Sequence, residues 1–265
     1  MRKAETGELI VLEDRDDYAL MRMNRADKRN AVNRAMRIAM LDAMERVRAT
    51  HKVVVLTGTD KSFCAGIDLK ESRADREAGR GEDPTSDWNE VNVAIRRHPA
   101  VFIAAVNGLA LGGGSTLINV CDLAIAAGEA EIGMPEMGFA TYPSLAGPAA
   151  QLALSRKRAA FLILTAKRID GATAEHWGLV NQCVPMSELL DAADTLARHV
   201  AQFDGAALTE SKRAIDYIPN VVSDWRQAFE YGTKVNALIR SRSSAPREGL
   251  ARFATGDRNP GQGTS

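Results

Sequence analysis

Two patterns of hydrophobic and polar positions alternate along the first part of the chain. Short apolar runs at 9–14 and 18–23, joined by a charged turn, predict two strands. The stretch 30–50 follows, with apolar residues at three- and four-residue spacing, which predicts an amphipathic helix. The run at 52–58 is apolar and β-branched, as is typical of a strand buried on both faces. Strand, helix and buried strand in this order indicate an α/β fold.

The same order repeats in the middle of the chain. Buried strands are predicted at 100–108 and 121–127, and the helix between them opens at the glycine run 112–114. Residues 70–90 are polar and charged, with Gly and Pro among them, which predicts a solvated loop.

Beyond residue 185 three helical patterns follow one another without strands between them. The chain length of 265 residues suits one large domain, or one domain with an appendage. We therefore expect an α/β core, a helical region and a disordered tail, at 1–185, 186–255 and 256–265 respectively.

Charge and cysteine content narrow the class of protein. The 34 basic and 34 acidic side chains give a net charge of zero, which predicts no nucleic-acid partner and no membrane partner. Cys64, Cys121 and Cys183 are scattered, so neither a disulfide framework nor a metal site is predicted. No apolar run has the length of a signal peptide or a membrane span, and we expect a cytoplasmic protein.

Two glycine-containing turns, at 62–69 and 107–115, follow buried strands. Ligands gather at the carboxyl ends of strands in α/β sheets, so both turns could face one site. Gly112–Gly114 would expose unpaired amides at a helix start, which suits a developing oxyanion. An amide from the turn Ala65–Ile67 would complete a two-donor oxyanion hole. The alternative is that the glycines permit tight packing of helix on strand; the spacing does not match a dinucleotide-binding motif.

Glu136 is the candidate proton carrier. It follows Pro135 in the apolar segment 132–139, where partial desolvation would raise its pKa toward the range useful for proton transfer. The alternative is an ordinary exposed acid in a loop. Apolar neighbours could line a pocket or simply pack: Met134, Met137, Phe139, Tyr142 and Leu145.

Taken together, these segments resemble the crotonase superfamily, that of enoyl-CoA hydratases and isomerases. Ala26 stands where the family commonly has proline. The resemblance runs in family order from about residue 8 to 185 and is carried by NRADKRNAV (24–32), SFCAGIDLKE (62–71), AAVNGLALGGGSTLINVCDLAIA (104–126), IGMPEMGF (132–139) and AKRIDGATAEHWGLVNQCVP (166–185).

The resemblance implies a role for particular residues. It makes the backbone N–H groups of Ile67 and Gly113 the oxyanion donors and Glu136 the catalytic acid or base. Lys28 would contact the CoA phosphates, although a solvated lysine in a turn is the alternative. The remaining substrate-binding residues that we predict, besides Ile67 and Gly113, are Ala65 and Leu69 along the CoA path, Pro135 and Phe139 beside the acyl group, and Tyr231.

The resemblance also implies a fold and an assembly. Repeated ββα units would form a spiral, and C-terminal helices would mediate formation of a homotrimer, often paired into a hexamer. The substrate would be an acyl-CoA thioester, and no cofactor is expected because coenzyme A arrives as part of the substrate.

One position departs from the family pattern. Many related hydratases carry a second glutamate where this chain has Thr116, whose hydroxyl can position water or substrate but does not titrate near neutral pH. Hydration or dehydration of a 2-enoyl-CoA is the function we expect. Double-bond isomerisation and carbon–carbon cleavage stay open, because hydroxycinnamoyl-CoA hydratase-lyases also combine one glutamate with a small hydroxyl residue. Those enzymes use a C-terminal tyrosine as well, and Tyr231 either matches it or packs as an ordinary aromatic residue.

Two other classes are alternatives. A serine peptidase would need Ser115 together with a histidine and an aspartate. The four histidines follow no matching pattern: His51, His98, His176 and His199. A non-catalytic protein that binds CoA or RNA is the second alternative, and turnover of an enoyl-CoA would decide against it.

Overall fold

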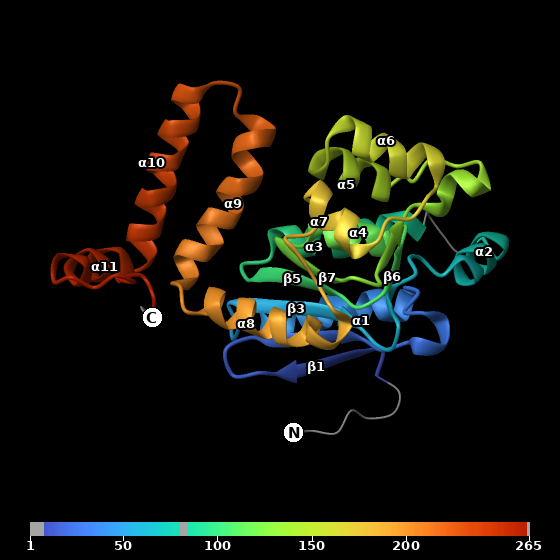
Figure 1. Ribbon diagram of the computed structural model, residues 1–265, viewed down its shortest axis with the longest axis horizontal. Coiled ribbons are helices and arrows are strands. Elements are labelled where there is room, and N and C mark those ends of the chain that lie inside the picture. Colours follow the sequence, from blue (N-terminus) through green and yellow to red (C-terminus); the bar gives the residue numbers. More distant parts are fainter. Residues whose placement is uncertain (1–7, 80–83, 264–265) are drawn as a thin grey trace.

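The computed structural model describes residues 8–79 and 84–263, which form a six-stranded and a three-stranded sheet surrounded by helices (Figure 1). In the larger sheet, β1 and β2 are antiparallel and the other neighbours are parallel. The first five strands coincide with the apolar runs that predicted them, so the α/β fold is confirmed. In sheet order the strands are β1 (Ile10–Asp14), β2 (Ala19–Met23), β3 (Val53–Gly58), β5 (Val101–Val106), β7 (Leu123–Ala127) and β9 (Gln182–Val184).

The chain winds as a spiral in which successive turns add one strand to each sheet. Short strands follow β3, β5 and β7 and pair with one another in parallel. The carboxyl ends of these short strands therefore lie side by side, and the repeated ββα arrangement that the resemblance implied is confirmed. The short strands are β4 (Ser62–Cys64), β6 (Leu109–Leu111) and β8 (Glu131–Gly133).

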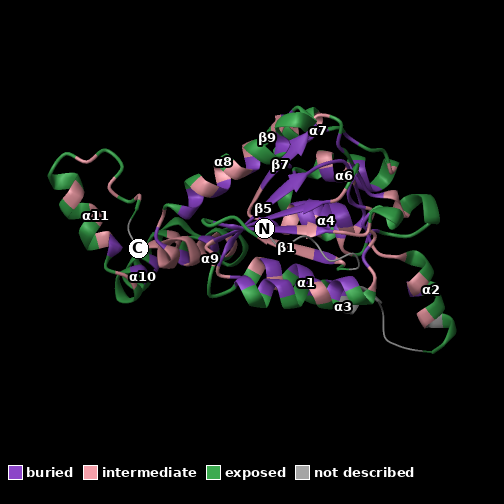
Figure 2. Ribbon diagram, turned by 90° about the horizontal axis from the view of Figure 1, so that it is seen from below, coloured by how far each residue is buried: buried purple, intermediate pink, exposed green. Residues whose placement is uncertain are grey.

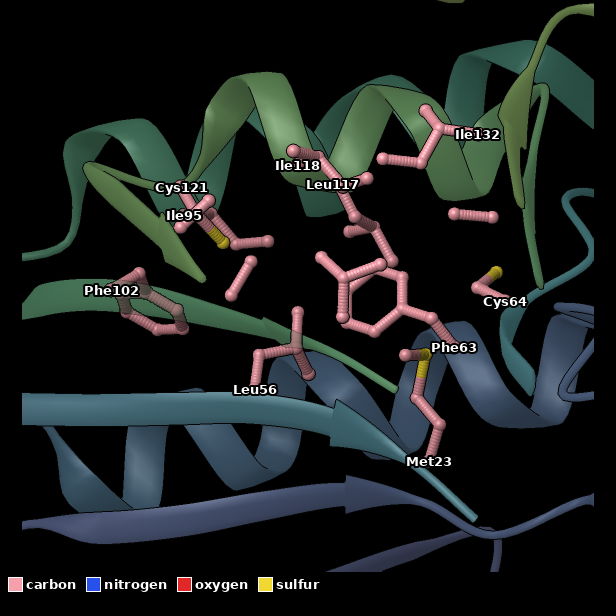
Figure 3. Packing of buried hydrophobic residues seen from close by; sticks show 14 of the residues in the cluster. Met23, Leu56, Phe63, Cys64, Ile95, Phe102, Leu117, Ile118, Cys121 and Ile132 are labelled. Carbon is pink, nitrogen blue, oxygen red and sulfur yellow. The ribbon is translucent and has the colours of Figure 1, made fainter. Parts of the chain in front are cut away.

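Hydrophobic cores lie on both faces of the six-stranded sheet. One face packs against α1 (Arg34–Val47), α3 (Pro84–Arg97) and α4 (Gly113–Val120). Figure 3 shows Phe63 and Leu117 close together in this core. The other face is covered by α8, which spans Leu189–Ala201. The inner strands β2, β3, β5 and β7 are almost entirely buried between these layers, whereas the edge strands β1 and β9 are partly exposed (Figure 2).

The helix predicted at 30–50 forms as α1. Its N-cap is Asn33, whose side chain accepts a hydrogen bond from the amide of Met36 at 2.9 Å. This bond satisfies one of the amides that a helix start leaves without an intrahelical partner. Met36, Met40 and Met44 are buried against the sheet, so the predicted apolar stripe is the face that packs.

The solvated loop predicted at 70–90 is wrong, because most of this segment is helical. The helix α2 spans Leu69–Glu77, and α3 begins at Pro84; residues 80–83 lie outside the described chain. α2 consists largely of charged residues, which gave no pattern of burial to detect. α3 does bury residues at helical spacing: Trp88, Val91 and Ile95.

The helices beyond β9 divide between two places. α8 packs on the sheet and is therefore part of the α/β body. α9 (Gly205–Val221), α10 (Trp225–Arg242) and α11 (Ala245–Ala254) extend away from that body (Figure 1). α9 is anchored by Lys212, whose buried ammonium group lies 2.8 Å from the carboxylate of Asp122 and donates to two backbone carbonyls.

The segment 256–265, predicted to be a disordered tail, contacts α11 in its described part. Arg252 donates to the carboxylate of Asp257 at 2.8 Å and to the carbonyl of Gln262 at 2.7 Å, so residues 256–263 fold back onto α11. The last two residues lie outside the described chain. The other helical elements are η1 (Ala26–Lys28), η2 (Pro135–Phe139), α5 (Ala146–Ala153), α6 (Arg156–Thr165), α7 (Gly171–Trp177) and η3 (Met186–Glu188).

His98 is a buried histidine whose ring bonds to the backbone. Its Nδ1 accepts a hydrogen bond from the amide of Ala100 at 3.1 Å, so Nε2 carries the proton and donates to the carbonyl of Met44 at 3.0 Å. Burial lowers the pKa of His98 to about 4, because the protein interior disfavours the charged imidazolium form.

Acidification is therefore expected to destabilise the fold through His98. As the pH falls from 6.5 toward 4, the unfolded chain takes up a proton that the folded chain does not, and the free energy of unfolding falls by at most about 3 kcal/mol. Urea unfolding of the wild type and of His98→Phe at several pH values measures this. The difference in the free energy of unfolding between the two proteins should shrink as the pH falls. A constant difference would contradict the lowered pKa of His98.

Candidate active site

Two backbone hydrogen bonds fix the direction of the Ile67 amide in the turn after β4. Val32 donates to the carbonyl of Gly66 at 2.7 Å, and Asp68 donates to the carbonyl of Val32 at 3.0 Å. These bonds form a parallel bridge along one edge of the segment 66–68. The central residue of such a bridge points its N–H to the opposite edge, so the N–H of Ile67 points away from Val32.

Arg25 and Asn30 hold this turn in place. The guanidinium group of Arg25 donates to the carboxylate of Asp68 at 2.7 Å. Asn30 is fully buried and donates to the carbonyl of Ser62 at 2.7 Å. Charge-assisted bonds like that of Arg25 are shorter and stronger than neutral ones. Arg25 therefore positions the amide of Ile67, a role that the sequence motif around it did not reveal.

Steric contacts explain why two of the three consecutive residues, Gly112 and Gly114, are glycines. A Cβ atom on Gly114 would lie 2.0 Å from the carbonyl oxygen of Cys64, so this glycine allows α4 to pack on β4. Gly112 has a φ of +51°, in the left-handed region, and a Cβ atom there would lie 2.6 Å from Oε1 of Glu136. The packing explanation therefore holds for Gly114, whereas Gly112 leaves room for the candidate proton carrier.

The amides of Ile67 and Gly113 come from turns that touch. A Cβ atom on Gly66 would lie 3.1 Å from the nitrogen of Gly113. Gly113 is the first residue of α4, so its N–H has no acceptor within the helix. Among the described residues neither amide donates a hydrogen bond to a protein group. Two free donors at the positive end of a helix form a site suited to an anionic oxygen.

Glu136 lies beside these amides at the start of η2, directly after β8. It is half-buried, and its Oε2 atom is buried without a hydrogen-bond partner among the described residues. Burial raises the pKa of Glu136 above its ordinary value, because the carboxylate loses hydration. A carboxyl group with a raised pKa is a stronger base than an exposed glutamate, which suits a group that takes up and returns a proton.

Thr116 lies on the first turn of α4 and is almost fully buried. Its hydroxyl donates to the carbonyl of Gly112 at 3.3 Å. The side chain is thus close to the glycine turn, but its proton is engaged with the helix backbone. It supplies no second titratable group beside Glu136.

The predicted CoA-contacting residues lie along the rim of the first turn. Ala65 is half-buried and donates its amide to the carbonyl of Arg29 at 3.0 Å. Leu69, the first residue of α2, is 60% exposed. Lys28 is exposed at the end of η1, with its ammonium group 3.6 Å from the carboxylate of Asp27. These side chains are available to a ligand that lies over the turn.

Of the predicted acyl-group contacts, the structure brings two close to Glu136 and separates the third. Pro135 and Phe139 share η2 with Glu136, and Phe139 is exposed. Tyr231 lies on α10 and stacks on Tyr217 with ring centroids 4.4 Å apart. Figures 1 and 2 both place α4 within the α/β body and α10 on the projection outside it. Of the other apolar residues predicted near Glu136, Met134 is buried and Leu145 is half-buried. Met137 and Tyr142 are exposed.

The peptidase alternative finds no support in the geometry. The hydroxyl oxygen of Ser115 is buried and has no hydrogen-bond partner in the described part of the chain, whereas a nucleophilic serine needs a histidine base in reach. Within residues 8–79 and 84–263, no cluster of three or more His, Cys, Asp and Glu side chains could hold a metal ion. No helix in these ranges is both long and apolar enough to cross a membrane.

The burial of Glu136 predicts a pH-dependent effect on stability. Because its folded-state pKa is raised, ionisation costs the folded chain more than the unfolded chain, and stability is lost as the pH rises above the ordinary pKa of glutamate. Glu136→Gln should therefore unfold at a higher temperature than the wild type at pH 8 and at nearly the same temperature at pH 4. Calorimetric melting curves at both pH values measure this, and a gain confined to pH 4 would contradict it.

Comparisons with known proteins agree with this geometry. A family model described as enoyl-CoA hydratase/isomerase matches residues 13–254. The chain is 34% identical to a probable enoyl-CoA hydratase of Rhizobium meliloti, over 79% of this chain and 81% of that protein. It is 28% identical to a hydroxycinnamoyl-CoA hydratase-lyase of Pseudomonas fluorescens, over 92% of this chain and 91% of that protein. A crystal structure of an enoyl-CoA hydratase from Bacillus anthracis superimposes with a TM-score of 0.84 at 29% identity, covering 94% of this chain and 96% of that one.

Proposed function

Because the chain belongs to the enoyl-CoA hydratase/isomerase family, we propose that it adds water to the double bond of a 2-enoyl-CoA thioester, and removes it in the reverse reaction. One observation carries this proposal: the carboxyl group of Glu136 lies against Gly112, and the next residue, Gly113, has a free amide. A proton carrier and an oxyanion site can thus act on the same few atoms of one bound thioester.

The two amides bind the thioester oxygen. Ile67 and Gly113 donate to it, and negative charge grows on this oxygen as a nucleophile adds at C3 and an enolate forms. The donors therefore bind the transition state more strongly than the ground state. A fixed donor of this kind typically contributes about 3–4 kcal/mol to lowering the barrier.

Glu136 moves the proton. Its carboxylate takes a proton from water as the water oxygen bonds to C3, and the electron pair of the double bond moves onto the thioester oxygen. The resulting carboxylic acid then returns this proton to C2 as the enolate collapses. Burial raises the pKa of Glu136, so its carboxylate is a stronger base than an exposed glutamate, which favours the first step.

Thr116 favours a second candidate reaction, the cleavage of a 3-hydroxyacyl-CoA. Without a second carboxylate, Glu136 could take the proton of the C3 hydroxyl instead, and the C2–C3 bond would break to give an aldehyde and a CoA enolate held by the two amides. The similarity to a hydratase-lyase over 92% of the chain supports this alternative. Isomerisation of an enoyl-CoA, with Glu136 moving a proton between carbons, is compatible with the same groups.

The rim residues take the CoA part of the substrate. Ala65, Ile67 and Leu69 line the path of the pantetheine and adenine groups, and the exposed Lys28 contacts the phosphates. Pro135 and Phe139 contact the acyl group, beside Glu136 on η2. Coenzyme A enters with the substrate, and the reaction as written needs no further cofactor.

The helices α9, α10 and α11 mediate assembly into a homotrimer or hexamer. They project from the body and expose large apolar side chains that a second copy would cover. Tyr231 lies on this projection, so it can reach an acyl group only in the site of a neighbouring copy. We place the enzyme in the cytoplasm, with neither nucleic acid nor membrane as a partner. The exposed apolar side chains include Ile215, Val221, Trp225, Phe229, Leu250 and Phe253.

A panel of saturated, 2-enoyl, 3-enoyl and 3-hydroxyacyl-CoA esters, with products read by mass spectrometry, tests the reaction. Hydration predicts a product that is heavier than the 2-enoyl ester by one water molecule. Cleavage predicts a shortened CoA ester, and isomerisation predicts a product of unchanged mass. Tight CoA or RNA binding without turnover of any ester would favour the non-catalytic alternative. Light scattering of the purified protein measures the assembly, and a monomer would overturn the trimer proposal.

A further inference from the structure

The indole of Trp88 is a buried polar group that the mechanism above leaves unused. Trp88 lies on α3, is fully buried, and its Nε1 atom has no hydrogen-bond partner among the described residues. A buried tryptophan N–H usually finds an acceptor, because leaving the bond unmade costs the full loss of hydration. The position of this N–H therefore calls for an explanation.

The nitrogen edge of the indole lies against Gly113, whose amide is one of the two proposed oxyanion donors. Nε1 lies 3.0 Å from the point where a Cβ atom on Gly113 would stand, and Cε2 of the same ring lies 3.4 Å from it. Asn92, one turn further along α3, donates to the carbonyl of Trp88 at 2.6 Å. The ring belongs to the hydrophobic core on this side of the sheet, so packing fixes its orientation. A Cβ atom at position 113 would make a tight contact with the indole nitrogen, so glycine eases this approach.

The thioester oxygen is not the partner of this N–H. A carbonyl oxygen has two lone pairs, and the amides of Ile67 and Gly113 already use both. A third donor beside them must serve another oxygen close to the thioester. In the proposed reaction that atom is the oxygen at C3, which arrives as water and becomes the hydroxyl group of the product.

We propose that the indole N–H of Trp88 binds the oxygen at C3 of the acyl group while Glu136 exchanges a proton with the same oxygen. Oε2 of Glu136 is also buried and unpartnered in the described structure. An unpartnered donor thus lies against Gly113, and the side chain with the unpartnered acceptor lies against the adjacent Gly112. In this proposal Trp88, and not Thr116, positions the oxygen at C3. Related hydratases use a second glutamate for this purpose. The inference rests on the proposed function and makes 3-oxygenated acyl-CoA esters the preferred ligands of the site.

Binding measurements in a variant without turnover test this inference. In a Glu136→Gln background, calorimetric titration gives the Kd of butanoyl-CoA and of each enantiomer of 3-hydroxybutanoyl-CoA. Adding Trp88→Phe should weaken binding of one hydroxy enantiomer about tenfold, because one hydrogen bond is lost. Butanoyl-CoA should change by less than about twofold, since it has no C3 oxygen. Equal changes for all ligands, or no change, would overturn the inference.

Two further proteins separate this result from a packing defect. A variant with β-(3-benzothienyl)alanine at position 88 keeps the bicyclic ring and replaces only the N–H by sulfur, and it should show the same selective loss. Trp177→Phe is the matched control, since Trp177 is half-buried and its ring contacts Phe161 on α6, and it should bind all ligands as the parent does. If the parent binds no acyl-CoA at all, the proposed function fails; if it binds them and the selective loss is absent, only the role of Trp88 fails.

Discussion

Glu136→Gln should hydrate 2-enoyl-CoA with a kcat lower by a factor of about 10² to 10⁴. Glutamine has nearly the same shape as glutamate but cannot take a proton from water or return one to C2. The contacts to the CoA moiety and the two amides are unaffected, so Kd for a saturated acyl-CoA should change by less than about twofold. Steady-state kinetics, together with titration of the saturated ester, measure both quantities.

Glu131→Gln is the matched control for this substitution. Glu131 lies at the start of β8, is exposed, and pairs with Arg168 at 2.6 Å, away from the glycine turn. The control should retain wild-type kcat and KM, because exposed pairs contribute little and this one touches no proposed substrate atom. Full activity in Glu136→Gln would refute the role of Glu136 as proton carrier.

Gly113→Pro should lower kcat by a factor of about 10² to 10³, because proline has no N–H and one oxyanion donor is lost. Gly113 is the first residue of α4, the position at which proline is best tolerated in a helix. Its amide makes no bond to the protein in the described structure, so its removal breaks no native hydrogen bond. Kinetics with the best ester of the panel measure the effect.

The control for this variant is Gly113→Ala. Alanine places a Cβ atom 3.0 Å from Nε1 of Trp88, as proline would, but it keeps the N–H. The decrease in kcat that alanine causes is therefore steric. The additional decrease with proline is due to the missing N–H donor. Equal activities of the two variants would show that the amide of Gly113 contributes nothing to the reaction.

The elements that the sequence predicts correctly are those whose pattern is local. β3, β5 and β7 are buried on both faces, so each is a continuous apolar run that periodicity detects directly. α1 shows its buried methionines at helical spacing. Glu136 and the glycine turn could be found because each lies in a short apolar or glycine-rich segment, and because these segments follow one another in a family order.

The features that the sequence does not reveal depend on distant contacts. The strands β4 and β6 are only three residues long and lie within glycine-rich turns, so pairing alone makes them strands. Arg25 acts on Asp68, 43 residues away, and no spacing rule connects them. Trp88 could have been placed on a helix from its spacing with Val91 and Ile95. Its unpaired N–H beside Gly113 exists only once α3 packs on α4.

The most direct test of the oxyanion site is the vibration of the thioester carbonyl itself. Infrared difference spectra of butanoyl-CoA with and without a ¹³C label at this carbonyl isolate its stretching band in the bound state. Two amide donors polarise the bond, so the band should move to lower wavenumber on binding to the wild type and move less in Gly113→Pro. A bound band at the wavenumber of the free ester in water, or an equal shift in both proteins, would contradict donation by Ile67 and Gly113.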